Sequence, residues 1–173
     1  MTRRRATGLV VPLEAARPLA EPWRHLLPES TRGLPPHVTV LWPFLAPDDV
    51  DDEVEARLAA LLAAVEPFEV QLTSFGSFPD AFYLTPEPAA PFAELTRLVW
   101  REWPECPPFG GAFDEVAPHL TVALDPDAAA LAALTAAVAP QLPLAARADR
   151  VLLFEEAEDG MYQPRRWFGL GAG

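Results

Sequence analysis

The sequence predicts an α+β fold: a bilobal, pseudo-twofold arrangement of two antiparallel sheets with helices on the outer faces. Two observations support this prediction. The pattern His-apolar-Thr-apolar (HxTx) occurs at residues 37–40 and again at residues 119–122. In both halves of the chain a Pro-Asp step, a helical pattern and two strand-like runs follow the motif. We therefore expect residues 1–173 to form a single bilobal domain with a divergent internal duplication, in which the two HxTx strands face a central cleft.

The elements of the first half follow from local patterns. Alternating or apolar runs predict strands, and apolar residues at helical spacing predict helices, the first of them interrupted by Pro18 and Pro22. Asp48 can cap the second helix. Trp42 and Phe44 after the first motif either pack in the core, which we favour, or serve as platforms on which a base stacks. The expected elements are a strand at 6–12, a helix at 13–27, the motif strand at 37–41, a helix with the stripe Val54, Leu58, Leu61, Leu62 and Val65, and a hairpin of 68–73 with 81–84.

The second half repeats this order. A loop rich in Pro, Gly and Phe at 106–117 leads into the second motif strand. An acidic hairpin tip at 155–160 joins the last two strands. The expected elements are a helix around 92–99 that ends before Pro104, the motif strand at 119–124, an alanine-rich helix with Leu131, Leu134 and Val138 inward, and strands at 150–154 and 166–170.

Composition narrows the class of function. A net charge of −12 is the opposite of the field that grips a long polyphosphate backbone, so it favours a small nucleotide or an RNA terminus over extended nucleic acid. The single cysteine excludes an intramolecular disulfide. The basic start resembles the beginning of a secretory signal peptide, but the apolar stretch after it is short and interrupted by Glu14, so we do not expect secretion. No apolar run is long enough to span a bilayer. We expect a cytoplasmic protein without a membrane segment; the oligomeric state stays open, and a monomer fits the sequence.

The repeated motif carries the chemistry. Side chains alternate along a strand, so His37 and Thr39 project together, as do His119 and Thr121. Histidines near their usual pKa can act as base and acid on a phosphodiester, while threonine hydroxyls donate to its non-bridging oxygens. One copy alone is typical of a polar pair in a sheet, but two copies in matching contexts favour catalysis. Two histidines are too few for a zinc site, so we expect no metal and no cofactor.

Two further sets of residues are candidates for substrate binding. Phe109 and Phe113 flank Gly110-Gly111 before the second motif, where they either stack on a nucleobase or pack against the protein. Arg165 and Arg166 precede the last strand, where one of them either reaches the cleft and pairs with phosphate or stays in solvent.

The paired motifs resemble those of the two-histidine (2H) phosphoesterase superfamily, and most of all the bacterial 2′-5′ RNA ligase-like proteins. The likeness covers the segments PPHVTVLWPF and PHLTVAL and the tail VLLFEE…MYQPRRWFGL. It implies a bilobal fold, a metal-independent cleft and activity on 2′,3′-cyclic phosphates or 2′-5′ linkages. By position it implies that His37 and His119 are acid and base, in an order the sequence leaves open, and that Thr39 and Thr121 bind phosphate.

The chain departs from this pattern at Leu124, where relatives that act on RNA ends often carry arginine. Together with the negative charge, this difference favours a cyclic phosphodiesterase over a ligase. The sequence therefore predicts a metal-independent phosphoesterase that hydrolyses a 2′,3′-cyclic or related small nucleotide or RNA-end phosphodiester. The alternatives are a binding module for a cyclic nucleotide or RNA end without turnover, and a 2′-5′ RNA ligase.

Overall fold

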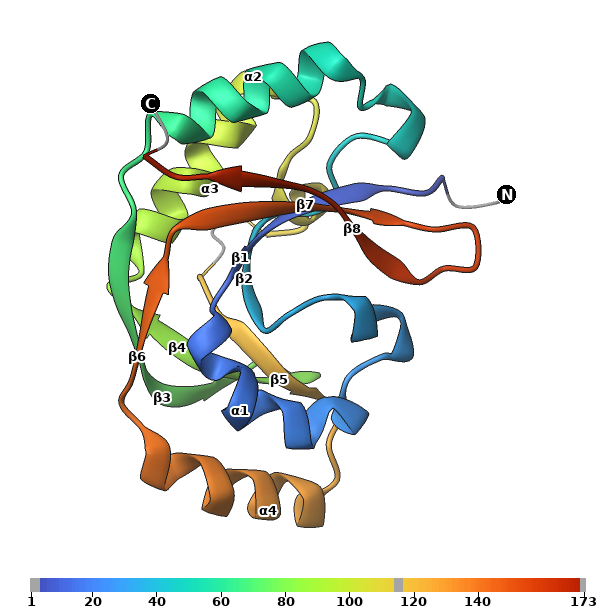
Figure 1. The fold of residues 1–173 in the computed structure, drawn as a ribbon. Helices are drawn as coiled ribbons and strands as arrows, with labels where there is room; N and C mark the ends of the chain where they lie inside the picture. The colour runs from blue at the N-terminus through green and yellow to red at the C-terminus, as the bar shows by residue number, and fades with distance from the viewer. Residues whose placement is uncertain (1–3, 114–116, 172–173) are drawn as a thin grey trace.

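Two four-stranded antiparallel sheets build this protein, a computed structural model of which describes residues 4–113 and 117–171 (Figure 1). One sheet has the strand order β2-β1-β7-β8 and the other has the order β5-β4-β3-β6. The strands are β1 (Thr7–Pro12), β2 (His37–Leu41), β3 (Phe68–Ser77), β4 (Ala81–Glu87), β5 (Leu120–Leu124), β6 (Leu144–Ala148), β7 (Arg150–Glu156) and β8 (Tyr162–Gly169). The predicted fold of two antiparallel sheets with helices is confirmed.

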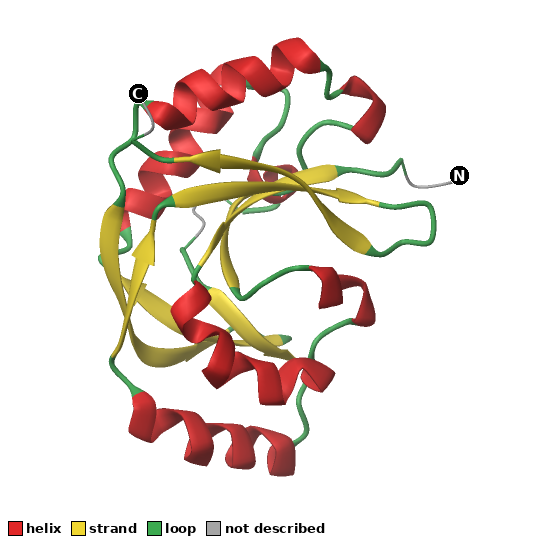
Figure 2. Cartoon of the chain, in the orientation of Figure 1, coloured by secondary structure: helices red, strands yellow, loops and turns green. Residues whose placement is uncertain are grey.

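Long helices lie beyond the two sheets at opposite ends of the molecule, whereas short helices lie between the sheets (Figure 2). The helix α2 lies against β8 and α3 lies against β2, whereas the short helices η1 and η2 lie against β6 and β5. The α-helices are α1 (Arg17–Ala20), α2 (Asp52–Ala63), α3 (Ala90–Glu102) and α4 (Ala128–Val138). The 3-10 helices are η1 (Glu14–Ala16), η2 (Glu21–Leu26), η3 (Glu29–Gly33), η4 (Pro47–Asp49), η5 (Pro108–Gly111) and η6 (Ala139–Gln141). No helix of the described residues is long and apolar enough to cross a membrane.

The two sheets do not correspond to the two halves of the sequence. The hairpin of β3 and β4 pairs with β5, the second motif strand, although it follows the first motif in the chain. The sheet that holds β2 is completed by β7 and β8 from the other end of the chain. Each sheet therefore depends on strands far apart in sequence. The internal duplication itself stays a prediction.

Each motif strand lies at an edge of its sheet rather than at its centre. Within the described part of the chain, β2 pairs only with β1 and β5 only with β4. Each therefore has one edge free of its own sheet, and these two strands lie against each other. Their aliphatic side chains Val38, Val40, Leu120 and Val122 belong to one continuous buried cluster. The alternation that the motifs predict is confirmed, and it turns the histidines and threonines away from the core.

Three local predictions differ from the structure. Residues 13–27 form η1, α1 and η2 instead of one helix, because Pro18 and Pro22 lack the N–H of an uninterrupted ladder. Asp51, not Asp48, caps α2: its carboxylate accepts from the Val54 backbone N–H at 2.9 Å. The strand β6 was not predicted, since Leu144-Ala-Ala-Arg-Ala148 has no strongly β-forming residue.

Residues 1–3 and 114–116, at the basic start and in the predicted loop 106–117, lie outside the described residues.

Candidate active site

Both motifs line one cavity of about 300 Å³. His37 and Thr39 reach it from β2, and Thr121 reaches it from β5. His119 lies directly before β5 and lines the same cavity. The contact between the free edges of β2 and β5 explains this convergence, because the motif side chains on each strand share one face. The four residues predicted from the motifs are thus brought together.

The tautomer of each histidine is fixed by a backbone carbonyl two residues earlier. His37 Nδ1 lies 2.8 Å from the Pro35 oxygen, and His119 Nδ1 lies 2.7 Å from the Ala117 oxygen. A carbonyl oxygen only accepts hydrogen bonds, so each Nδ1 carries a proton and donates it. Each Nε2 is consequently the ring nitrogen that exchanges a proton with a ligand.

The surroundings of His37 favour its neutral form. Burial lowers the pKa of His37 below its ordinary value of 6.5, and the charges of His119 and Arg24 lower it further. The hydrogen bond to Pro35 opposes this effect only in part. At neutral pH the His37 Nε2 therefore holds a free lone pair, as a general base requires.

His119 is held in a different environment, against aromatic rings. The Phe78 ring meets its imidazole edge-on at 5.0 Å between centroids, and the Tyr83 ring lies at 5.3 Å. Tyr83 is also the partner of Thr121 in the register of β4 and β5. The strand next to the second motif therefore fixes the orientation of its histidine.

The two threonine hydroxyls are available to a ligand. Thr39 and Thr121 are partly buried, and within residues 4–113 and 117–171 neither hydroxyl makes a hydrogen bond. A hydroxyl can donate one hydrogen bond and rotates to suit its acceptor. Two such donors beside two imidazoles are suited to an oxyanion such as phosphate.

Aromatic side chains form another wall of the cavity. Phe109 lines it, as predicted for one arm of the aromatic loop, and its N–H donates to the Trp42 oxygen at 2.6 Å. Phe113 does not: it is 63% exposed and only touches the Phe109 ring edge-on. Trp42 is partly buried: it packs against the buried cluster that contains Phe154, with 5.3 Å between the ring centroids, and it also lines the cavity. Phe44 is buried as predicted.

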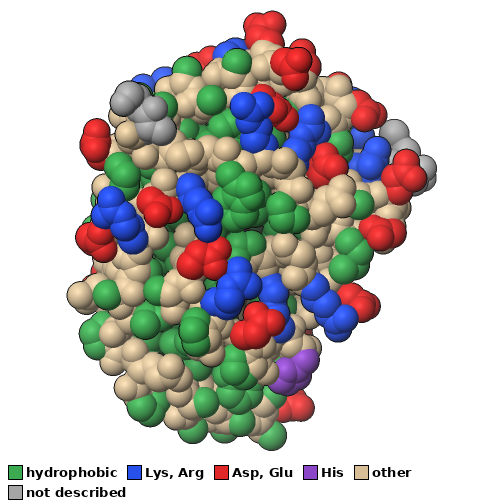
Figure 3. Space-filling view, in the orientation of Figure 1, with side chains coloured by type: hydrophobic (Ala, Val, Ile, Leu, Met, Phe, Trp, Pro, Cys, Tyr) green, Lys and Arg blue, Asp and Glu red, His purple; other side chains and the backbone are tan. Residues whose placement is uncertain are grey.

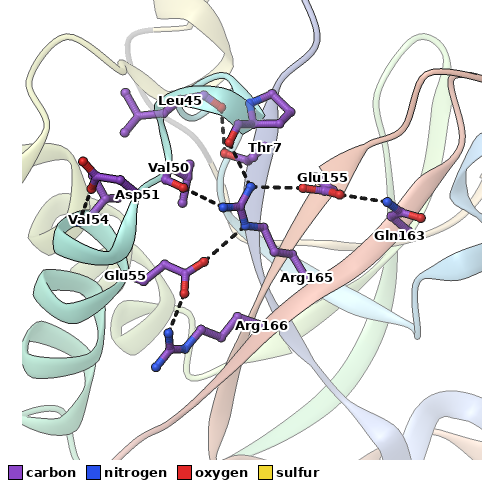
Figure 4. Close-up of polar contacts among 11 residues, drawn as sticks. Thr7, Leu45, Val50, Asp51, Val54, Glu55, Glu155, Gln163, Arg165 and Arg166 are labelled. Carbon is purple, nitrogen blue, oxygen red and sulfur yellow. Dashed lines mark hydrogen bonds and ion pairs between the residues drawn. The ribbon is translucent and has the colours of Figure 1, made fainter.

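Arg165 and Arg166 do not line the cavity, so neither reaches it as the sequence had allowed; Figure 4 shows the contacts that they make instead. Arg165 donates to Glu155, to Glu55 and to two backbone oxygens near the start of α2, and Arg166 also pairs with Glu55. Burial would raise the pKa of the Glu55 carboxyl, but hydrogen bonds from Arg166 and Arg165 bring it below its usual value. Both arginines therefore tie β8 to α2 and hold the fold together.

Sequence reasoning missed one charged residue of the cavity, Arg24. It lies on η2, beside β5, in a segment where two prolines disturb the helical pattern. No motif marks this position, so only the folded chain reveals it. Among the described residues, no group of three or more His, Cys, Asp or Glu side chains is arranged to hold a metal ion.

Comparison with known families identifies the chain. Residues 11–160 match the 2′-5′ RNA ligase superfamily. The chain belongs to this superfamily. The resemblance drawn from the two HxTx motifs is thereby confirmed, and with it the assignment to the 2H phosphoesterase and 2′-5′ RNA ligase-like group.

Solved structures similar to this chain share its fold. E. coli LigT complexed with NADP+ is 19% identical with a TM-score of 0.60, covering 98% of this chain and 99% of that chain. E. coli LigT complexed with 3′-AMP is 17% identical with a TM-score of 0.57, covering 97% and 99%. The protein TT0787 of Thermus thermophilus is 21% identical with a TM-score of 0.60, covering 96% and 98%. No curated protein sequence matches the chain.

Proposed function

We propose that this superfamily member is a cytoplasmic, metal-independent phosphoesterase that hydrolyses a 2′,3′-cyclic or related small nucleotide or RNA-end phosphodiester. The observation that carries the proposal is the pair of imidazoles lining one cavity, each with Nδ1 bound to a backbone carbonyl and Nε2 left for proton exchange. Two threonine hydroxyls line the same space. The solved structures of E. coli LigT complexed with 3′-AMP, phosphate, ATP and NADP+ support a small nucleotide as the substrate class.

The proposed roles follow from the different surroundings of the two histidines. His37, whose pKa is lowered by burial, accepts a proton from water at Nε2 as the water oxygen bonds to phosphorus. The bond from phosphorus to one ribose oxygen breaks, and that oxygen takes a proton from His119 Nε2. Thr39 and Thr121 donate to the non-bridging oxygens, where negative charge develops. The product is a nucleoside monophosphate, and the two histidines end in exchanged protonation states.

Turnover of 2′,3′-cyclic nucleotides in the presence of a chelator tests the proposal. We expect His37→Ala and His119→Ala each to lower kcat/KM by about a thousandfold, and the double variant to lose little more, because the two residues act as a unit. His25→Ala is the matched control: this third histidine is exposed and lies outside the cavity, so its loss should leave kcat/KM unchanged.

Other outcomes would separate this proposal from its alternatives. Activity that survives both substitutions would contradict the two-histidine mechanism, and activity lost with the chelator would contradict its metal independence. Binding of the cyclic nucleotide without product would favour a non-catalytic binding module. Joining of cleaved RNA halves through a 2′-5′ linkage would favour a ligase.

A further inference from the structure

The cavity has an asymmetric charge. Of the described residues that line it, Arg24 alone is permanently charged, and none is an aspartate or glutamate. These are unusual surroundings for an arginine in a protein with 13 basic and 25 acidic residues. Elsewhere the two signs are interspersed on the surface, as the face in Figure 3 illustrates. The cavity is therefore a local site of positive charge on an acidic protein.

Arg24 is fixed next to the first motif. Its Nη1 donates to the Arg32 oxygen at 3.2 Å, and its Nη2 donates to the Leu34 oxygen. The next carbonyl along the chain, that of Pro35, accepts from His37 Nδ1. The guanidinium and the imidazole are thus anchored to consecutive peptide carbonyls. The Arg24 charge accordingly acts on His37 and contributes to its lowered pKa.

The segment that carries these anchors is itself fixed between the two sheets. The helix η2 lies against β5 and η3 lies against β8. At Gly33, the end of η3, a Cβ atom would come within 2.2 Å of the Tyr162 backbone oxygen, so only glycine allows this approach. Tyr162 is a cavity residue. The guanidinium is therefore held by a braced segment rather than by a loose loop.

The Arg24 charge is only weakly compensated. Within the described residues, the one carboxylate within 4.0 Å of its guanidinium is that of Glu21, at 3.5 Å from Nε. The Glu21 side chain is 55% exposed and lies outside the cavity lining, whereas the Arg24 side chain is 20% exposed. An ion pair with so exposed a partner contributes little. Of the five guanidinium N–H groups, those not directed at Glu21, Arg32 and Leu34 remain for a ligand.

We propose that Arg24 binds the phosphate of the substrate and supplies the positive charge that selects anionic ligands for this cavity. The proposal rests on the proposed function only in taking phosphate as the ligand. Charge-assisted hydrogen bonds to phosphate oxygens are the strong kind, and a partly buried guanidinium is suited to them. An exclusively structural role, in which Arg24 only holds the Arg32 and Leu34 carbonyls, is the alternative to be separated.

Calorimetric titration with inorganic phosphate makes the separation without relying on turnover. We expect Arg24→Gln to weaken phosphate binding by about tenfold or more, and Arg24→Lys to weaken it less, because lysine retains the charge but lacks the planar guanidinium. Arg32→Gln is the matched control. It removes the same charge from η3, where Arg32 pairs with Glu29 at 2.7 Å and both side chains are at least 60% exposed. Phosphate binding should be unchanged in this variant.

A second variant predicts the opposite sign and avoids any change at Arg24. Glu21→Gln removes the carboxylate beside the guanidinium, so phosphate should bind about two- to threefold more tightly, since exposed pairs are worth well under a tenfold factor. Glu29→Gln, with the same change in net charge, serves as its control. This pair of variants decides the question if Arg24→Gln does not fold, as judged by circular dichroism.

The results that would overturn the proposal are specific. Equal phosphate affinity in the wild type and Arg24→Gln would do so, as would equal losses in Arg24→Lys and Arg24→Gln, or Glu21→Gln behaving like Glu29→Gln. Absence of phosphate binding by the wild-type protein would also overturn it. Failure of the proposed function is distinguishable, because it is measured by turnover in the His37 and His119 variants.

Discussion

His37 and His119 come from the same motif but stand in different surroundings. His37 is partly buried and lies close to the fixed charge of Arg24, whereas His119 packs against two aromatic rings. The two histidines are therefore alike in the backbone carbonyl that orients each ring, but their other surroundings differ. In the proposed mechanism, this difference gives two chemically similar residues two roles in one proton-transfer cycle.

The lowered pKa of His37 predicts the acid limb of the pH profile. A base with a pKa below 6.5 is mostly deprotonated at pH 7 and is lost only as the pH falls through that lowered value. We therefore expect the midpoint of the fall in kcat/KM for a 2′,3′-cyclic nucleotide on the acid side to lie below pH 6.5. Steady-state kinetics from about pH 4.5 to 9 measures this limb. His25→Gln, outside the cavity, should leave the limb in place, and an acid limb with its midpoint above pH 6.5 would contradict His37 as the base.

The sequence predicts where a side chain points more reliably on a regular strand than on an interrupted helix. The period of two along the motif places His37 and Thr39 on one face, and the burial of Val38 and Val40 confirms the alternation. The position of Arg24 fits neither a helical nor a strand periodicity, because the prolines around it divide the segment into short helices. Its place in the cavity depends on contacts with β5 that no local pattern encodes.

Among the elements, α2 shows how a helix start depends on the turn before it. Pro47–Asp49 forms a 3-10 turn, so the α-helix begins later than the Pro-Asp step suggests, and Asp51 becomes the N-cap. The helix α4 keeps the simpler arrangement, in which Asp127 of the Pro-Asp step accepts from the Ala130 N–H at 2.7 Å. The two motifs are thus followed by helices with different starts.

This difference gives a prediction on stability. Asp51→Ala should lower the free energy of unfolding by about 1 kcal/mol, because the Val54 N–H loses its acceptor and aspartate is among the residues preferred at an N-cap. Asp48→Ala is the control, since Asp48 does not cap the helix. Urea unfolding followed by circular dichroism gives both values. A larger loss for Asp48→Ala would show that the helix start lies at the Pro-Asp step in solution.

Each of the two sheets contains strands from both the first and the second half of the chain. Most strands could be found from the sequence because their patterns are local, but their partners could not. The hairpin of β3 and β4 pairs with β5 from the second motif, and β7 pairs with β1 from the N-terminal end. Such pairings join residues far apart in the chain, as in Leu9 opposite Leu153. These long-range pairings bring both motifs to one cavity. From the sequence, a shared site could be inferred only because the residues of the two motifs suit the same reaction.

The net charge of −12 leads to a prediction about substrate length. An acidic protein repels the added phosphates of an RNA chain. Because salt screens charges, this repulsion extends over about 30 Å at 0.01 M salt but only about 10 Å at 0.1 M. We expect kcat/KM at low salt to be higher for a 2′,3′-cyclic mononucleotide than for an RNA oligomer with the same end, and the difference to narrow as salt is added. An oligomer of equal length with uncharged backbone linkages should lack the salt-dependent part. A preference for the charged oligomer that weakens with salt is the behaviour of a basic RNA-binding protein, and it would contradict selection for small substrates.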